Sequence, residues 1–139
     1  MATKVENEFK APSQMSESAA AAHVVVSPAA LVGTWVNVNK ATRDLIKVVI
    51  SASGTALSVE AYGACSPTPC DWGKVSGLAY AANVSSSAAV AFSAHYTFSF
   101  AQVILTAHLQ GSELIVESFT QFTDGSGRSN MYNSDKMKK

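Results

Sequence analysis

The sequence predicts an all-β protein in which eight antiparallel strands form one closed up-and-down β-barrel, preceded by a disordered N-terminal tail. Three observations predict this fold. From Leu31 onward, short segments rich in β-branched and aromatic residues alternate with clusters of turn residues. Most connections are short, which favours antiparallel neighbours. Closing the sheet also removes exposed edge strands, which invite aggregation. A flattened two-sheet sandwich is the main structural alternative.

The chain has 139 residues, the size of one ordinary domain. We assign residues 1–28 to a flexible N-terminal tail, because they are rich in Ser, Ala and Glu and show no sustained hydrophobic period. We assign residues 29–139 to the barrel domain.

The sequence pattern indicates some of the first four expected strands more clearly than others. The first surrounds the sequence Gly-Thr-Trp-Val-Asn, and the second is rich in β-branched residues and stops at the turn Ser53–Gly54. The third follows that turn directly. A longer loop, residues 63–73, precedes the fourth, which has the weakest pattern. The expected ranges are 32–38, 45–51, 56–62 and 76–82.

The last four expected strands alternate more regularly. In the fifth and sixth, every second residue is apolar and shares one face of the strand. These residues are Phe92, Ala94, Tyr96 and Phe98 in the fifth strand, and Val103, Leu105, Ala107 and Leu109 in the sixth. Turns at residues 111–112 and 124–127 separate the sixth, seventh and eighth strands. The expected ranges are 90–98, 101–109, 113–122 and 129–137.

Composition excludes some classes of partner. Hydrophobic residues make up 47% of the chain, charged residues only 14%, and the formal net charge is +0. Such a chain lacks the field that attracts phosphate backbones or anionic lipid, so we expect neither a nucleic acid nor a membrane as partner. The sequence has no apolar run of membrane-spanning length, and its acidic first residues are unlike a basic secretory leader. We expect a cytoplasmic protein, with leaderless secretion as the open alternative.

The two cysteines, Cys65 and Cys70, lie in the expected 63–73 loop as Cys-Ser-Pro-Thr-Pro-Cys. They would close a small loop as a disulfide in an oxidising compartment and would usually stay reduced in the cytosol, so both states remain open. Their spacing is not that of a redox Cys-x-x-Cys motif, and no second cysteine pair completes a zinc site. With no dinucleotide, P-loop or metalloprotease motif either, we expect no metal and no cofactor.

Several expected strands are apolar on both faces. Ile46, Val48 and Ile50 alternate with Leu45 and Val49, and Ile104 and Ile115 have apolar neighbours on both sides. A sheet with one solvated face should instead be polar at alternate positions. We therefore expect a second subunit to cover the outer apolar surface, which predicts a homo-oligomer.

Two short motifs resemble a known family. Residues 33–37 read Gly-Thr-Trp-Val-Asn, and residues 133–138 read Asn-Ser-Asp-Lys-Met-Lys. They resemble the calycin superfamily of lipocalins, fatty-acid-binding proteins and avidins, and are most similar to the avidin and streptavidin form. This resemblance implies a ligand-binding barrel in which Asn37 meets the polar head of the ligand and Asp135 accepts from its N–H groups. Because Met137 replaces the family's aromatic residue, we do not expect biotin itself.

Trp35 and Asn37 are two residues apart, so they share one face of their strand. In one interpretation Trp35 plugs the floor of the barrel and Asn37 bonds to backbone groups or water. In the other, the two residues anchor a polar ligand. A buried Asn needs hydrogen-bond partners in either case.

Four further candidate residues lie in or beside expected loops. Asp71 and Trp72 either form a turn that covers the core or act as a lid, in which Trp72 stacks on a ring or sugar and Asp71 accepts from hydroxyl groups. Tyr62 precedes this loop and is expected beside the same pocket. Arg128 closes the turn sequence 124–128, where hairpin chemistry explains the residues and an anion or glycan contact is the alternative.

His95, His108 and Glu117 fall on neighbouring expected strands. They resemble a metal or acid–base set only loosely, and solvent-facing or hydrogen-bonded histidines are the favoured interpretation.

These observations support three hypotheses of function. The first is a non-enzymatic barrel that binds a small molecule or a carbohydrate. The second is a barrel isomerase or cyclase, for which His95, Glu117 or Asp135 would supply the acid or base. The third is an oligomeric interaction or defence protein with a filled barrel. We favour the first, because the sequence contains no recognisable catalytic motif.

Overall fold

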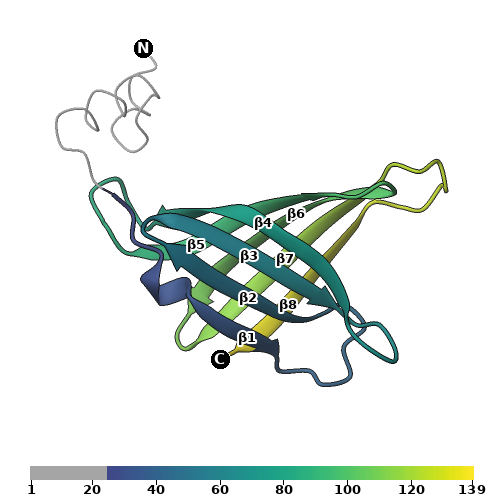
Figure 1. Cartoon of the computed structure of the whole chain (residues 1–139), viewed down its shortest axis with the longest axis horizontal. Helices are drawn as coiled ribbons and strands as arrows, with labels where there is room; N and C mark the ends of the chain where they lie inside the picture. Colours follow the sequence, from purple (N-terminus) through teal and green to yellow (C-terminus); the bar gives the residue numbers. More distant parts are fainter. Residues whose placement is uncertain (1–24) are drawn as a thin grey trace, which may run out of the picture.

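The computed structural model describes residues 25–139, and these residues contain the expected closed barrel of eight antiparallel strands (Figure 1). Each strand pairs with its neighbours in the sequence, and β1 closes the ring by pairing with β8. The closed ring, consistent with a calycin-like fold, rules out the two-sheet sandwich. The strands are β1 (Gly33–Asn37), β2 (Leu45–Ser53), β3 (Ala56–Gly63), β4 (Cys70–Ala81), β5 (Ala89–Thr97), β6 (Ala101–Gln110), β7 (Glu113–Phe122) and β8 (Met131–Lys138).

A short 3-10 helix, η1 (Ala29–Leu31), leads into β1 and buries Leu31 completely. Just before it, the Ser27 N–H donates to the carbonyl of Ser87 at 2.7 Å, and the Ser27 carbonyl accepts from the N–H of Ala89 at 2.9 Å. The expected tail falls mainly on residues 1–24, which lie outside the described residues. Within residues 25–139, no helix is long and apolar enough to cross a membrane.

The interior of the barrel is filled by the residues whose alternation predicted the strands. Val103, Leu105 and Ala107 of β6 are all buried, as are Phe92 and Tyr96 of β5. Burying large apolar side chains on one face contributes about 1.5–3 kcal/mol for each residue, which fixes the register of the strands. The periodicity of β5 and β6 therefore identified the inner wall correctly.

Strand β4 differs most from its expected range, since it begins at Cys70 rather than at residue 76. Asp71 and Trp72 therefore lie in a strand, where the prediction placed a loop. Asp71 pairs with Tyr62 of β3, and a register shift follows between Glu60 and Tyr62. Gly73 has a φ of +93°, a conformation that glycine adopts without strain. The hydrophobic pattern of the sequence did not indicate where β4 begins, because the irregular pairing interrupts the alternation of inward and outward residues.

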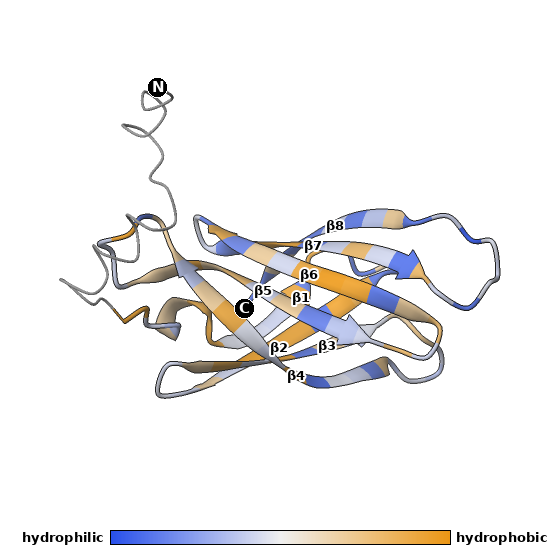
Figure 2. Cartoon of the chain, turned by 90° about the horizontal axis from the view of Figure 1, so that it is seen from above, coloured by the Kyte–Doolittle hydropathy of each residue, from blue (hydrophilic) through white to orange (hydrophobic). Residues whose placement is uncertain are grey.

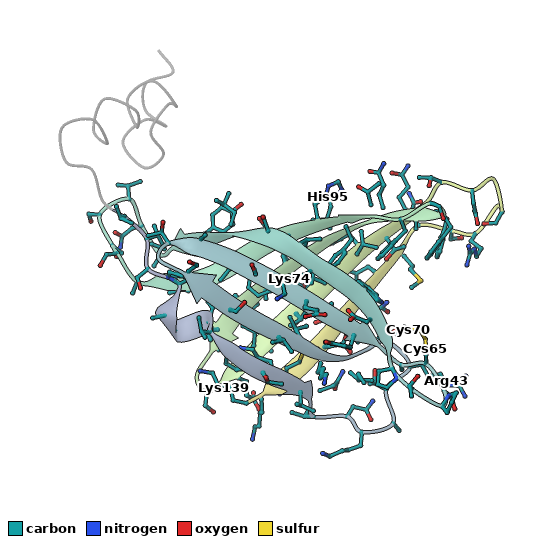
Figure 3. All side chains as sticks on the ribbon, viewed as in Figure 1. Arg43, Cys65, Cys70, Lys74, His95 and Lys139 are labelled. Atoms are coloured by element: carbon teal, nitrogen blue, oxygen red, sulfur yellow. A yellow bond between two sulfur atoms is a disulfide. The ribbon has the colours of Figure 1, made fainter. Side chains whose placement is uncertain are left out.

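The two ends of the barrel have different character. At one end lie the β1–β2, β3–β4, β5–β6 and β7–β8 connections, and this end carries Arg43, Cys65 and Cys70 (Figure 3). Lys139 is at the opposite end, where its Nζ lies 5.0 Å from the centre of the Trp35 ring. We call the first end the mouth and the second end the floor.

Candidate functional site

The mouth of the barrel contains a cavity of about 480 Å³. This volume falls within the range of sites that enclose small organic ligands. Its walls are mainly apolar, with Trp72 from β4, Phe98 from the β5–β6 turn, and Val103 from β6. Leu45 of β2 and Asn133 of β8 also line it, so residues from around the barrel converge on one space.

Aromatic rings form one wall of this cavity. The Trp72 ring meets Tyr96 and Phe98 edge-on, with centroids 5.4 and 5.6 Å away. Phe98 in turn stacks on Tyr96 at 5.6 Å and on Phe100 at 5.4 Å. Edge-to-face and stacked pairs hold aromatic side chains in defined orientations. The wall therefore presents fixed apolar ring surfaces, of which Trp72, Phe98 and Phe100 line the cavity.

Tyr96 fixes this wall to the backbone of two other strands. Its hydroxyl lies 2.8 Å from the carbonyl oxygen of Gly73 and 3.2 Å from that of Val59, and it accepts from the N–H of Ala61 at 3.1 Å. Burial raises the pKa of Tyr96 to about 12, so the hydroxyl keeps its proton at neutral pH. Tyr96 is a supporting residue that sequence analysis placed in the core without recognising its hydrogen bonds.

Trp72 is held from its other side by Gly63 and the neighbouring loop. A Cβ atom on Gly63 would lie 3.0 Å from the Trp72 Nε1, so glycine is what allows the indole to approach. Cys65 and Cys70 form a disulfide, with Cα atoms 5.4 Å apart, and both line the cavity. The disulfide is one of the two states that the sequence left open. It closes the β3–β4 loop at the rim of the cavity.

A hydrogen-bonded polar pair lies next to the lining residues. Asn37 Nδ2 donates to the Leu45 carbonyl at 2.8 Å and to Asp135 Oδ1 at 3.0 Å, and Asn37 Oδ1 accepts from the N–H of Asn39 at 2.8 Å. Asn37 and Asp135 are 5% and 9% exposed. The structure therefore brings together the two residues that the resemblance singled out, although they are 98 positions apart.

The second oxygen of Asp135 has no partner among the described residues. Oδ2 is buried and accepts no hydrogen bond, which is unusual for a carboxylate in a folded protein. Burial raises the pKa of Asp135, the hydrogen bond from Asn37 lowers it, and the negative charge of Asp44 raises it further. Asp135 thus combines a costly unpaired acceptor with a pKa above its ordinary value, both common at functional sites.

Several residues at the mouth were missed by sequence reasoning. Arg43 and Asp44 line the cavity from the β1–β2 loop, Phe100 lines it from the β5–β6 turn, and Phe122 lines it as the last residue of β7. These positions lie at or just outside strand ends and carry no motif of their own. Only their shared position at one end of an up-and-down barrel identifies them, and that position depends on the closed topology.

The predicted site residues fall in different places. Asp71 and Trp72 line the cavity. Asn37 and Asp135 do not line it, and Asn37 is linked to it through its hydrogen bond to the carbonyl of Leu45, a lining residue. Trp35 lies toward the floor, where its Nε1 donates to the Leu31 carbonyl at 2.9 Å; it is only 2% exposed and does not line the mouth. The structure thus favours its interpretation as a plug.

Tyr62, which we expected beside the same pocket, lies elsewhere. Its side chain is on the outer side of β3, with Lys47 Nζ 4.5 Å from the ring centre, and it is not among the residues that line the cavity. The neighbouring inward positions are Ala61 and Gly63, both buried. Alternation of the strand therefore points Tyr62 away from the cavity.

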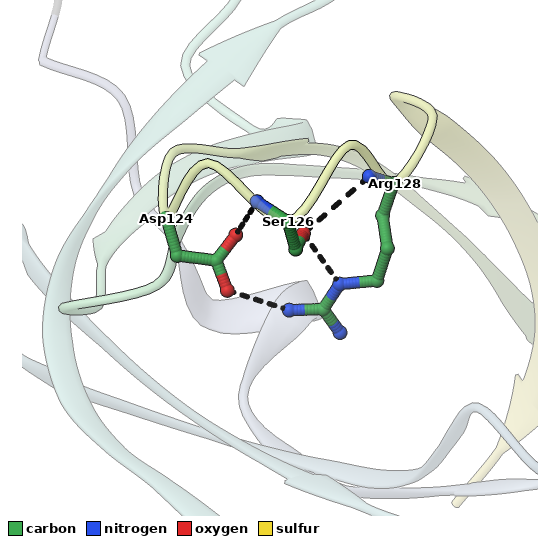
Figure 4. A network of polar contacts seen from close by, with 3 residues as sticks. All are labelled: Asp124, Ser126 and Arg128. Carbon is green, nitrogen blue, oxygen red and sulfur yellow. Dashed lines mark hydrogen bonds and ion pairs between the residues drawn. The ribbon is translucent and has the colours of Figure 1, made fainter.

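Arg128 is folded back on its own turn (Figure 4). Its Nη2 lies 3.0 Å from Asp124 Oδ2, its Nε donates to Ser126 Oγ at 3.0 Å, and its guanidinium lies 3.9 Å from the centre of the Phe122 ring. Hydrogen bonds from Ser126 and the ion pair with Arg128 lower the pKa of Asp124. These contacts use the guanidinium internally, as hairpin chemistry predicted.

Replacing Arg128 by Ala should leave thermal stability almost unchanged. The ion pair with Asp124 is exposed, and exposed pairs contribute little because water and salt screen them. Scanning calorimetry measures the change. A large loss of stability in Arg128→Ala would show that the turn depends on this ion pair.

His95, His108 and Glu117 all face outward, away from the cavity. His95 projects from the outer surface of β5 (Figure 3), and Glu117 accepts a hydrogen bond from the Tyr132 hydroxyl at 2.6 Å. Within residues 25–139, no group of three or more His, Cys, Asp or Glu side chains is placed to hold a metal ion. His95, Glu117 and Asp135 were the three candidates for an acid or base, and of these only Asp135 lies inside the barrel.

Comparisons with known proteins do not assign a function to this site. No protein-family model matches the chain, and searches of curated proteins and of solved structures found no match either.

Proposed function

We propose that this barrel binds a small organic molecule in its mouth without transforming it. The observation that carries the proposal is a cavity of about 480 Å³, beside which a buried carboxylate keeps one oxygen without a partner. A flat apolar part of the ligand would lie against Trp72 and Phe98. An N–H or O–H group of the ligand would donate to Asp135 Oδ2.

This division of roles follows from the physics of buried sites. Apolar walls supply most of the affinity, and a few fixed polar groups select the orientation. Leaving a buried acceptor without a hydrogen bond costs about 1–3 kcal/mol, so a ligand that supplies the donor recovers that free energy. Asn37 holds Asp135 Oδ1, so only Oδ2 remains for a ligand. An avidin-like barrel that binds a ligand other than biotin fits this arrangement.

The position of the two tryptophans provides a direct assay. Trp72 lines the cavity, whereas Trp35 is buried near the floor. A bound aromatic compound should change the fluorescence of Trp72 and leave that of Trp35 unaltered. Titrating panels of aromatic heterocycles, amides and mono- and disaccharides should therefore give saturable changes in the wild type that are absent in Trp72→Phe.

Calorimetry on the same panel separates the outcomes. Binding by ring compounds that carry N–H or O–H donors supports the proposal, and binding by saccharides alone would make the site a carbohydrate site. If no compound class binds, or if Trp72→Phe binds as tightly as the wild type, the mouth is not the binding site.

One observation favours an enzymatic second candidate. Burial raises the pKa of Asp135, and a raised pKa is common among carboxyl groups that act as general acids or bases. An isomerase or cyclase would then use Asp135 alone, because His95 and Glu117 are on the outer face. Mass spectrometry and NMR of each bound compound after incubation test this candidate, since binding without turnover returns the compound unchanged.

A further inference from the structure

The carboxylate of Asp135 is buried without a positive charge of the protein beside it. Its side chain is 9% exposed, its Oδ1 accepts from the neutral amide of Asn37 at 3.0 Å, and its Oδ2 accepts no hydrogen bond. No Lys, Arg or His of residues 25–139 forms an ion pair with it. Buried carboxylates are ordinarily paired with a cation, because an uncompensated charge in the interior is costly. The described part of the chain therefore supplies Oδ2 with neither a donor nor a balancing charge.

The charged residues that line the mouth cavity are mainly acidic. Asp44 and Asp71 line it together with one cation, Arg43, so the lining has an excess of one negative charge. Within the described residues, none of the three forms an ion pair. Asp71 Oδ1 accepts from the N–H of Gly73 at 2.9 Å, which leaves its charge uncompensated. The negative charge of Asp44 also acts on Asp135, whose pKa it raises. The electric field of these groups attracts positive charge to the cavity.

The β7–β8 loop, at the same end of the barrel, does not alter this balance. Figure 2 shows hydrophilic residues along this loop. Its two charges, Asp124 and Arg128, form an ion pair at 3.0 Å and neutralise each other. The Arg128 guanidinium also lies 3.9 Å from the centre of the Phe122 ring, and Phe122 lines the cavity. One aromatic ring of the mouth thus already contacts a cation, the charge that ring faces attract.

Three other kinds of ligand match these groups less well. A metal ion needs several oxygen, nitrogen or sulfur ligands, and no group of three or more such side chains is placed to hold one within residues 25–139. An anion would be repelled by Asp44, Asp71 and Asp135. A neutral donor would satisfy Oδ2 but would leave the buried charge unbalanced. A protonated amine supplies the hydrogen bond and the positive charge together.

We infer that the ligand of the mouth cavity is an organic cation, in which a protonated amine donates to Asp135 Oδ2 and an apolar ring lies against Trp72 and Phe98. This inference rests on the proposed binding function and adds the charge and chemical class of the ligand. Arg43 lies on the cavity lining and opposes the cation, so its charge reduces the affinity.

Three probes of similar shape and different charge test the inference. Phenethylamine is a cation at neutral pH, phenethyl alcohol keeps the ring, the chain and a donor without the charge, and phenylpropionate is an anion. Titration calorimetry should show that the amine binds about ten-fold more tightly than the alcohol, since a charge-assisted hydrogen bond is stronger than a neutral one. Binding of phenylpropionate should fall below detection. Added salt should weaken binding of the amine more than binding of the alcohol.

Two adjacent lining residues of opposite charge provide the matched variants. Asp44→Asn should lower the ratio of amine to alcohol affinity by about 3-fold, and Arg43→Gln should raise it by a similar factor. The backbone carbonyl of Asp44 accepts from the Ala64 N–H at 2.8 Å, and Asp44→Asn retains that bond. Glu113→Gln removes a carboxylate at the floor end of β7 and should leave the ratio unchanged. Circular dichroism verifies the folding of each variant.

The outcomes separate the charge of the ligand from the existence of the site. If the alcohol binds as tightly as the amine, or if phenylpropionate binds more tightly than either, the ligand is not a cation although the cavity binds ligands. A ratio that neither Asp44→Asn nor Arg43→Gln changes would also overturn the inference. Binding of a neutral heterocycle or saccharide with no binding of the amine would overturn it and leave the proposed function intact. The proposed function itself fails if no compound of the panel or of the three probes binds.

Discussion

Asp135→Asn should abolish ligand binding and at the same time make the free protein more stable at neutral pH. Asparagine can still accept the hydrogen bond from Asn37 through its oxygen. Its amide nitrogen then occupies the place of Oδ2, so the site presents a donor where the ligand donor needs an acceptor. We expect binding to fall below detection. The free energy of unfolding at neutral pH should rise by about 1 kcal/mol, because removing the buried charge outweighs the cost of burying the unpaired amide N–H groups.

The raised pKa of Asp135 determines the direction in which Asp135→Asn changes stability with pH. Burial raises the pKa of Asp135 in the folded protein above its ordinary value of 3.8, whereas the unfolded chain ionises near that value. Below that range both states hold the proton. As pH rises from there through the raised pKa, the unfolded state releases its proton first, so the wild type loses stability. Asp135→Asn should lack this loss, and its advantage should grow from acidic toward neutral pH.

Asp124→Asn is the matched control for the same chemical change. Asp124 is exposed in the β7–β8 turn, and Ser126 and Arg128 lower its pKa, so its carboxylate is stabilised when ionised. This variant should bind as the wild type does and should gain no stability at neutral pH. Urea unfolding at several pH values and binding titrations measure both variants. If Asp135→Asn is less stable than the wild type and still binds, Asp135 is a structural residue.

Trp35→Ala should cost about 3–5 kcal/mol of stability, the usual range for removing a large buried aromatic side chain. Trp35 is 2% exposed, and its indole ties β1 to the carbonyl of Leu31. Its loss would leave a void near the floor that the surrounding strands cannot fill without moving. Denaturant unfolding followed by circular dichroism measures the loss.

Trp35→Phe separates packing from the hydrogen bond. It keeps a ring in the core and should cost clearly less than Trp35→Ala, while the cavity at the mouth should keep its affinity for ligand. If Trp35→Ala does not fold, Trp35→Phe still tests the role by its smaller loss. A loss below about 1 kcal/mol for both variants, or a loss of affinity without a loss of stability, would contradict the role of Trp35 as a plug.

The sequence predicted the structure best where a single physical requirement determines the type of residue at each position. Inward positions such as Val103 and Leu105 must be apolar, so their period of two identified the strands and, with short turns, the closed barrel. The start of β4 was missed because the pairing of Asp71 with Tyr62 is followed by a register shift, and Gly73 adds a residue with positive φ. Local irregularity of this kind leaves no periodic signal.

The candidate site was predicted only in part, for a related reason. Asn37 and Asp135 came from the family resemblance, and Trp72 came from its loop-like surroundings. Phe98 and Arg43 join them because strands adjacent in the ring place their ends together, and no local pattern in the sequence carries that proximity.

Titration of the Asp135 side-chain carboxyl carbon by NMR tests the central claim most directly, first in the free protein and then with the cavity saturated by the tightest-binding compound of the panel. The account predicts a midpoint above the ordinary carboxyl range in the free protein and a fall on binding, because a ligand donor stabilises the ionised form. A midpoint that does not move when the compound binds would contradict the assignment of Asp135 as the ligand's acceptor.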